Sequence, residues 1–299
     1  MPSWQSYIVH PVLRVFVKRK LAKAFTPFEA RAAFGNHPPQ TVRGVSFTSG
    51  RVSDVQGEWA RGAAADGVML YMHGGGYFAC SPATHRPITG GFAARGLAVF
   101  APNYRLAPEH PFPAAIEDGL ACYRALLASY GARRLVVAGD SAGGGLALAT
   151  LLAAREAGLA MPAGLVLFSP WTDLAATGAS IQANAARESM LVGERIPEVA
   201  SLYLQGAPPD TPLASPLYAD LTGLPPTLIQ VSDREILLDD SRRVAEKINA
   251  AGGRAALSVW PNLPHAWQIS QSFLPEARQA LAQAADFARS TLASEAAAA

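Results

Sequence analysis

The sequence predicts an α/β fold in which a mostly parallel central sheet is flanked by helices on both faces. Short apolar runs typical of fully buried strands recur along the chain, and segments with helical apolar spacing separate them. The chain has 299 residues, of which 50% are hydrophobic, so it can bury one large core. We therefore expect a single domain over residues 1–299.

The elements can be placed in order along the chain. Residues 1 to about 40 should form helical pieces, and alternating stretches at 41–48 and 52–60 predict an antiparallel hairpin with its turn at Ser49-Gly50-Arg51. Strands are expected at 68–72, 97–101, 135–138, 164–168, 226–231 and 255–260, and helices at 82–95, 114–130, 144–153, 239–251 and 275–292. From 174 to about 205 the strand signal stops and a helical insert is expected. Together with 1–40 it would form a cap.

Composition excludes several classes of function. The net charge is +2, with 25 basic and 23 acidic residues, and no basic cluster is longer than Lys18-Arg19-Lys20, so nucleic acid is not an expected partner. Cys80 and Cys122 are too few for a disulfide framework and do not form the pattern of a structural metal site. No metal or cofactor is expected.

The N-terminal apolar stretch 7–17 is broken by His10, Pro11 and Arg14 and is followed by basic residues. This order is inverted for a secretory signal, and the run is too short to cross a bilayer. We expect no transmembrane segment and a cytoplasmic location. The stretch could instead touch a membrane or cover an active site, and the sequence alone leaves both uses open.

The segment Gly139-Asp140-Ser141-Ala142-Gly143 lies between an apolar strand-like run and a helical run. Glycines on both sides of a serine let the backbone bend tightly and expose the serine oxygen, as in a G-x-S-x-G nucleophile elbow. Ala142 would begin the helix, where a free backbone N–H can point at an anion. Taken by itself, the motif is also compatible with a glycine-rich packing turn.

A second glycine motif, His73-Gly74-Gly75-Gly76-Tyr77, follows the strand expected at 68–72. Ordering three successive glycines costs chain entropy, and close approach of bare N–H groups to a ligand oxygen would explain them. Such a loop can form an oxyanion hole. A phosphate-binding loop is excluded because neither G-x-x-x-x-G-K-[ST] nor a G-x-G-x-x-G with a suitably spaced acidic residue occurs.

A serine nucleophile needs a base, and the base needs a carboxylate to orient it. Of six histidines, only His265 follows the last strand, where ligands of open α/β sheets bind. His73 is expected to be a structural brace bonded to the backbone. The acid should follow the strand at 226–231, which leaves Asp233 and Glu235 as alternatives. Two further carboxylates, Asp239 and Asp240, fit the first turn of a helix.

Residues 72–77, 104–113, 139–145 and 235–241 resemble the bacterial hormone-sensitive-lipase family of esterases, which has the α/β-hydrolase fold, an HGGG loop and a GDSAG elbow. The resemblance runs over nearly the whole chain from about Arg43. In that family the acid opens a segment commonly written D-P-L-R-D, which here is Glu235-Ile236-Leu237-Leu238-Asp239. The resemblance therefore implies Glu235 as the acid, with Asp233 second. At this position the sequence departs from the commonest residue of the family, which is aspartate.

The same resemblance implies roles for the other site residues. Ser141 would be the nucleophile, His265 the general base and then acid, and the oxyanion donors would be the N–H groups of Gly75, Gly76 and Ala142. Tyr77 would line the substrate pocket beneath the cap. Asp140 and Trp171 are expected either to brace the site or to pack in the core.

The expected function is that of a cofactor-free serine carboxylesterase, which forms an acyl-enzyme from esters of short- to medium-chain acids. The expected partner is a small-molecule ester, and a homodimer is allowed. Acyl transfer or amide hydrolysis by the same residues is the first alternative. A non-catalytic receptor on the same fold is the second, and His265 counts against it.

Overall fold

The structure of the protein is a computed structural model that describes residues 2–24, 26–35 and 40–297. Eight strands in this part of the chain form one sheet in the order β1-β2-β4-β3-β5-β6-β7-β8. Their bounds are β1 Ser46–Val52, β2 Val55–Arg61, β3 Gly67–Met72, β4 Leu97–Pro102, β5 Leu135–Asp140, β6 Gly164–Phe168, β7 Thr227–Ser232 and β8 Ala255–Trp260. The two pairs that involve β2 are antiparallel and the pairs from β4 to β8 are parallel, which confirms the mostly parallel sheet.

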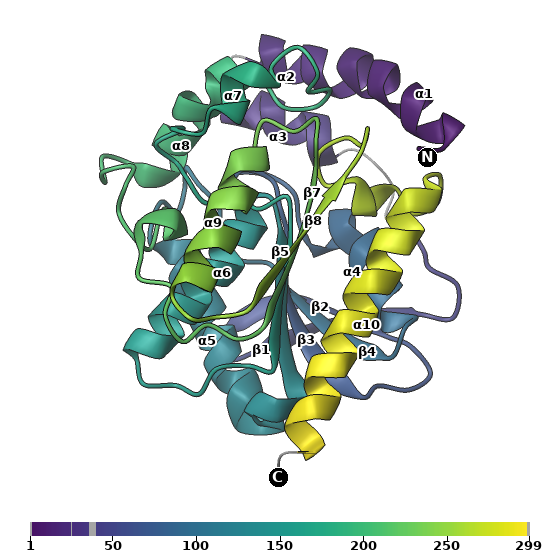
Figure 1. Ribbon diagram of the computed structural model, residues 1–299, viewed down its shortest axis with the longest axis vertical. Helices are drawn as coiled ribbons and strands as arrows, with labels where there is room; N and C mark the ends of the chain where they lie inside the picture. The colour runs from purple at the N-terminus through teal and green to yellow at the C-terminus, as the bar shows by residue number, and fades with distance from the viewer. Residues whose placement is uncertain (1, 25, 36–39, 298–299) are drawn as a thin grey trace.

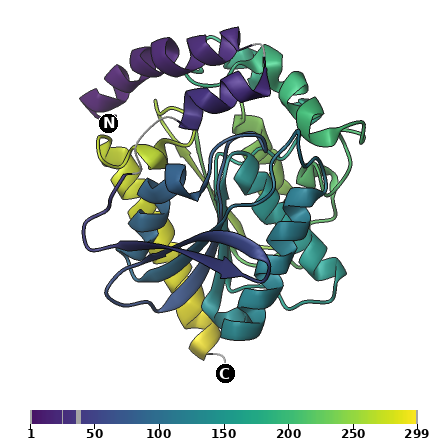
Figure 2. The same ribbon diagram turned by 180° about the vertical axis from the view of Figure 1, so that it is seen from behind.

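Helices cover both faces of the sheet, as Figures 1 and 2 show. Helices α5 (Ala114–Tyr130), α6 (Ala142–Glu156) and α9 (Leu238–Ala250) pack on one face, and α4 (Arg86–Ala93) and α10 (Pro275–Ala297) pack on the other. Every residue of β3, β5, β6 and β7 is buried, because these strands have helices on both sides. The continuous apolar runs in the sequence have this cause.

The hairpin turn lies at residues 53–54, so the turn expected at Ser49-Gly50-Arg51 is wrong. Gly50 lies inside β1, opposite Gly57. A Cβ atom on Gly50 would come within 2.8 Å of the Trp59 ring. This glycine therefore makes room for an aromatic side chain instead of bending the chain.

The N-terminal segment forms α1 (Trp4–Leu13), a π-helical turn (Arg14–Lys18), α2 (Arg19–Lys23) and α3 (Pro27–Gly35). In Figure 1 these helices lie across one end of the molecule, beside α7 (Ser180–Ala183) and α8 (Ile196–Leu204). The insert at 174–205 is less helical than expected, because residues 184–192 are irregular. Residues 1, 25 and 36–39 of the expected cap lie outside the described residues. Within the described part of the chain, no helix has the length and apolar character needed to cross a membrane.

Candidate active site

Ser141 lies in the turn between β5 and α6 with φ 53° and ψ −126°. A residue with a side chain rarely adopts a positive φ, so the surroundings must hold this conformation. The Ser141 N–H donates a hydrogen bond to the Phe168 carbonyl at 2.9 Å, and the Trp171 N–H donates to the Ser141 carbonyl at 2.8 Å. The end of β6 and the chain just after it therefore fix the turn.

The two outer glycines of the elbow are needed for close packing. A Cβ atom on Gly139 would lie 2.2 Å from the Gly143 carbonyl oxygen, and one on Gly143 would lie 2.2 Å from the Met72 carbonyl oxygen. Real Cβ atoms do not approach so closely, so a side chain at either position would displace backbone. The motif therefore packs the turn tightly and also leaves Ser141 at the wall of a cavity.

The glycine loop places free donors beside this cavity. The Gly74 N–H donates to Asp140 Oδ1 at 2.9 Å, and this bond holds the start of the loop. The N–H groups of Gly75, Gly76 and Ala142 donate to no acceptor in the part of the chain that the structure describes. Gly75 and Gly76 line the cavity together with Ser141. Free donors of this kind can stabilise negative charge on a substrate oxygen.

Glu235 and His265 form a buried pair. Glu235 Oε2 lies 2.6 Å from His265 Nδ1. The other carboxylate oxygen of Glu235 accepts hydrogen bonds from Ser169 Oγ at 2.8 Å and from the Ser232 N–H at 2.7 Å. Glu235 is fully buried, and these three hydrogen bonds hold its carboxylate in one orientation.

The second ring nitrogen of His265 is available for chemistry. His265 Nε2 is buried and has no hydrogen-bond partner among the described residues, and His265 lines the same cavity as Ser141. Burial alone would lower the pKa of His265, but the hydrogen bond and the charge of Glu235 outweigh burial and raise this pKa above 6.5. The ring can therefore accept a proton when one is offered from the cavity.

The Asp233 side chain bonds to Arg187 and Asn262. Its Oδ2 lies 3.2 Å from Arg187 Nη2 in a surface ion pair, and its Oδ1 accepts the Asn262 N–H at 2.9 Å. Of the two carboxylates that the sequence left open, the structure brings Glu235 to the histidine and turns Asp233 towards solvent.

His73 packs beneath the glycine loop as a neutral brace. Its Nδ1 lies 2.8 Å from the Gly74 carbonyl oxygen, and its ring stacks on Tyr104 with 4.3 Å between the centroids. Burial is the main cause that lowers its pKa to about 3, so the ring is uncharged near neutral pH. The bracing role expected from the sequence fits this geometry.

Asp140 ties the elbow to its neighbours. Besides Gly74, it accepts hydrogen bonds from the Tyr71 hydroxyl at 2.7 Å, and its Oδ2 lies 3.2 Å from His85 Nε2. Burial works to raise the pKa of Asp140, but the contact with His85 and the hydrogen bonds outweigh it, so the pKa is lowered. Asp140 therefore braces the site, which was one of the two roles open for it.

The cavity has a volume of about 200 Å³ and is mostly apolar where the two cap segments meet it. Tyr77 is not among the residues that line it. A φ of 64° turns Tyr77 inward, where its ring stacks on Tyr203 at 3.9 Å. The cap residues that line the cavity are Leu21, Thr26, Pro27, Met190, Leu191, Val192, Arg195, Ile196, Glu198, Val199 and Leu202.

Glu188 is a site neighbour that the sequence reasoning missed. It is buried, and its Oε1 accepts the N–H groups of Ser189 and Met190, each at 2.8 Å. Its Oε2 accepts the Ile236 N–H at 3.3 Å, next to Glu235. Glu188 thus links the irregular loop of the cap to the segment that carries Glu235. No sequence motif could predict this role, because its partners are backbone N–H groups that only the fold brings together.

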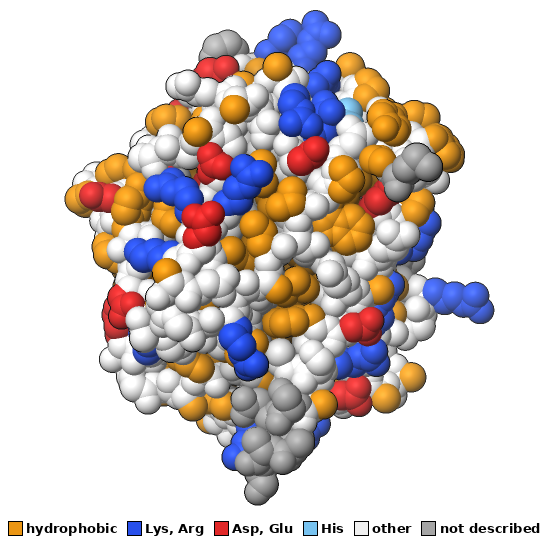
Figure 3. All heavy atoms as spheres, viewed as in Figure 1, with side chains coloured by type: hydrophobic (Ala, Val, Ile, Leu, Met, Phe, Trp, Pro, Cys, Tyr) orange, Lys and Arg blue, Asp and Glu red, His pale blue; other side chains and the backbone are white. Residues whose placement is uncertain are grey.

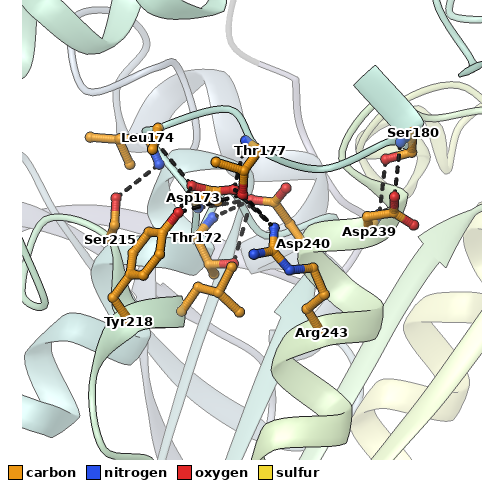
Figure 4. A network of polar contacts seen from close by, with 12 residues as sticks. Thr172, Asp173, Leu174, Thr177, Ser180, Ser215, Tyr218, Asp239, Asp240 and Arg243 are labelled. Atoms are coloured by element: carbon orange, nitrogen blue, oxygen red, sulfur yellow. Dashed lines mark hydrogen bonds and ion pairs between the residues drawn. The ribbon is translucent and has the colours of Figure 1, made fainter. Parts of the chain in front are cut away.

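A polar network fastens the chain after β6 to the start of α9, as Figure 4 shows. Asp240 Oδ2 accepts the N–H groups of Thr172 at 2.7 Å and Asp173 at 2.9 Å. Asp173 in turn lies 3.0 Å from Arg243. Asp240 lies in the first helical turn as expected, and burial, which is the largest effect, raises its pKa to about 7. No group of three or more metal-ligating side chains occurs among the residues described.

This sheet order, a serine in a strained strand-to-helix turn, and a histidine after the last strand define the α/β-hydrolase class of enzymes. Residues 69–269 match the family described as alpha/beta hydrolase fold. The chain is 44% identical to an acetyl-hydrolase of Streptomyces hygroscopicus over 87% of this chain and 86% of that one. It is 34% identical to an esterase of Acinetobacter venetianus over 96% of this chain and 97% of the other.

Among solved structures, an esterase from the bacterial hormone-sensitive lipase family is 42% identical and superposes with a TM-score of 0.91 over 98% of this chain and 99% of that one. The chain belongs to the alpha/beta hydrolase family, among the bacterial esterases similar to hormone-sensitive lipase, and is a carboxylic-ester hydrolase. The resemblance noted in the sequence is thereby confirmed.

Proposed function

We propose that this chain is a serine carboxylesterase that cleaves esters of short- to medium-chain acids through an acyl-enzyme intermediate. One observation carries the proposal. The Glu235–His265 pair, at 2.6 Å, leaves Nε2 of the histidine without a partner in the described chain, beside the cavity that Ser141 also lines. A nucleophile, a base and an acid that orients the base are then available in one place.

In the first half of the reaction, Ser141 Oγ attacks the ester carbonyl carbon and gives its proton to His265 Nε2. The carbonyl oxygen becomes an oxyanion, which would accept hydrogen bonds from the N–H groups of Gly75, Gly76 and Ala142. The tetrahedral intermediate collapses, the bond to the alkoxy oxygen breaks, and the alcohol leaves with the proton from His265. The acyl group remains on Ser141.

In the second half, water attacks the acyl carbon while His265 takes one of its protons. The bond to Ser141 Oγ breaks, the serine regains the proton, and the free acid leaves. Glu235 stays ionised throughout, holds the ring by its Nδ1 proton and stabilises the positive charge that the ring carries in each half.

The size and lining of the cavity support a short to medium acyl chain. A volume of about 200 Å³ with apolar walls suits a small hydrocarbon group. The name of the 44% identical relative, acetyl-hydrolase, points in the same direction. We propose that residues 1–40 and 174–205 act as the cap of a single domain, because residues from both segments line the cavity.

The test is hydrolysis of a series of p-nitrophenyl esters from acetate to palmitate by the parent protein and by Ser141→Ala. We expect the parent to be fastest on the short and medium esters and the variant to lose at least about 10³-fold in kcat. A fluorophosphonate probe should label the parent and not the variant. As a matched control, Ser129→Ala removes an exposed serine whose hydroxyl bonds only its own helix, so labelling and rate should persist.

Retention of the parent rate by Ser141→Ala would reject the serine mechanism. No probe labelling and no turnover by the parent would favour a receptor. Faster transfer to added alcohol than hydrolysis would favour an acyltransferase, because the acyl-enzyme would then prefer alcohol over water.

A further inference from the structure

The N-terminal helical segment 4–23 presents an apolar face to solvent. Its outer face, defined here by Trp4, Tyr7, Ile8, Val12, Val15 and Phe16, has exposed fractions from 46% to 63%. Most exposed apolar residues of a folded chain occur singly, whereas these six follow one another along one side of a helix. Phe273, which is 43% exposed, meets Trp4 edge to face at 6.1 Å and widens the patch.

The inner side of the same segment is already committed to the body of the protein. His10 is buried, and its Nδ1 lies 2.9 Å from Ser189 Oγ. Arg14 donates to the Ala186 carbonyl at 2.8 Å, and Lys18 donates to the Glu188 carbonyl at 2.9 Å. These bonds fix the rotation of the helix, so its outer face cannot turn inward without breaking them.

Charge is distributed unevenly in the same segment. Residues 1–28 contain five Lys and Arg residues and no Asp or Glu, although the whole chain has a net charge of only +2. Arg19, Lys20 and Lys23 are exposed, and none of them has an ion pair with a residue that the structure describes. An unneutralised basic group therefore follows directly after the apolar face.

Figure 3 shows hydrophobic side chains gathered over the end of the molecule where Figure 1 draws α1, with Lys and Arg side chains nearby. A helix with a broad apolar face, flanking aromatic residues and basic residues suits the boundary between headgroups and acyl chains of a bilayer. Anionic lipids attract the basic residues, and the aromatic rings enter the interface. The segment of 20 residues would be about 30 Å long and lie in the membrane plane.

We propose that this outer face docks on the surface of an anionic lipid membrane. A second copy of the chain is the other candidate occupant, but a two-fold symmetric contact through this face would bring two basic segments together without an acid on either. Charge complementarity therefore favours lipid. Leu21, near the end of this segment, and Thr26 and Pro27, just after it, line the cavity, so docking would bring the cavity close to the lipid surface.

The test is flotation of the full chain with vesicles of phosphatidylcholine alone and of phosphatidylcholine mixed with phosphatidylglycerol. We expect binding to the mixed vesicles that weakens as salt increases. Arg19→Gln combined with Lys20→Gln should lower the partition coefficient by about 25-fold, since each lost charge costs about fivefold. Trp4→Ser combined with Phe16→Ser should lower the partition coefficient at least about tenfold, because the membrane then no longer buries two aromatic rings.

The matched control is Tyr130→Ser combined with Val259→Ser, which removes two apolar side chains exposed on other elements at 37% and 41%. This control should bind like the parent. All variants should keep the parent thermal midpoint and the parent rate on dissolved p-nitrophenyl acetate, so a failure to bind is distinguished from a failure of the proposed function.

The proposal is overturned if the parent does not float with the mixed vesicles, or if the Trp4 and Phe16 double variant floats as well as the parent. It is also overturned if the parent forms a concentration-dependent dimer that this double variant abolishes while vesicles remain unbound. That result would assign the face to a second copy.

Discussion

Glu235 Oε2 lies 2.6 Å from His265 Nδ1, whereas Asp233, only two residues earlier, pairs with Arg187 at the surface. Between β7 and α9, the Glu235 side chain is buried, whereas the Asp233 side chain is 39% exposed. The Ser232 N–H bonds Glu235 and the Asn262 N–H bonds Asp233, so backbone donors hold each side chain where it is.

Glu235→Gln should lower kcat by about 10³- to 10⁴-fold, because an amide cannot stabilise the imidazolium and favours the wrong tautomer of His265. Asp233→Asn removes an exposed ion pair of about 1 kcal/mol or less and should keep nearly the parent rate. The measurement is kcat on p-nitrophenyl acetate for both variants. The assignment is wrong if Asp233→Asn is the variant that loses activity.

The pH dependence of kcat/KM should report the pKa of His265. The ring must be neutral to accept the serine proton, so activity falls as pH falls through that pKa. Glu235 raises the pKa against the effect of burial, which places the midpoint above 6.5. In Glu235→Gln the midpoint of the residual activity should move to lower pH. An unchanged midpoint in this variant would show that another group controls the acid limb.

The sequence was sufficient to predict those site residues that directly follow a strand of the parallel sheet. Ser141 and the glycine loop each follow a buried strand, His265 follows the partly exposed strand β8, and parallel strands end at one edge of the sheet. These residues therefore lie close together because of the sheet topology. That topology is predicted by apolar strand-like runs that alternate with helical segments.

Features that depend on side-chain direction could not be predicted in this way. Tyr77 follows the oxyanion glycines directly, yet a backbone with φ 64° sends its ring into the core against Tyr203. Gly50 was predicted to lie in a turn, because the sequence does not show that the Trp59 ring packs against it in the folded protein. Glu188 binds N–H groups of an irregular loop, whose path no local pattern of residues specifies.

Gly75→Ala should damage the glycine loop specifically. Gly75 has φ 120°, and an added Cβ would lie 2.2 Å from the Ala79 carbonyl oxygen, so the loop must shift and misplace its free N–H groups. Loss of one oxyanion donor costs about 10²- to 10³-fold in kcat, and we expect at least that. Gly131→Ala is the control, since Gly131 also has a positive φ of 76° but open space around it.

The control should lose about 1–3 kcal/mol of stability, because Gly131 has φ 76° and ψ 156°, which residues with a side chain rarely adopt, and it should keep the parent kcat. Circular dichroism and the thermal midpoint of each variant separate the two effects. Equal kcat values for Gly75→Ala and the parent would contradict the role of the loop.

Asp240 should make the protein less stable as pH rises from about 4 to 7. Burial raises its native pKa from 3.8 to about 7, so in this window the native state holds a proton that the unfolded state has released. The stability contributed by the protonated form is complete below pH 3.8 and is lost as pH rises through about 7. Asp240→Asn cannot ionise, while its amide oxygen can still accept the N–H groups of Thr172 and Asp173.

Urea unfolding of the parent and of Asp240→Asn at several pH values between 4.5 and 7.5 measures this difference. The parent should lose stability relative to the variant across the window, by on the order of a few kcal/mol. Parallel curves for the two proteins would mean that Asp240 has the same pKa in the native and unfolded states.

Val199 should control the length of the acyl chain. It lines the cavity from α8, and a Cβ on Gly76 would lie 3.1 Å from Val199 Cγ1, so the valine sits directly over the oxyanion loop. Val199→Trp adds an indole to a cavity of about 200 Å³. It should therefore hinder esters with longer acyl chains more than it hinders acetate esters. We expect the ratio of kcat/KM for hexanoate to that for acetate to fall by about 10-fold or more, since each methylene in a pocket is worth about 1–3 kcal/mol.

Val199→Ala is the matched opposite change and should raise the same ratio, because it removes two methyl groups from the wall. Ratios leave out differences in the amount of active enzyme, which affect both esters equally. A parallel loss on acetate and hexanoate in Val199→Trp would place the acyl chain elsewhere in the cavity, against the walls formed by residues 190–192 or by Leu21.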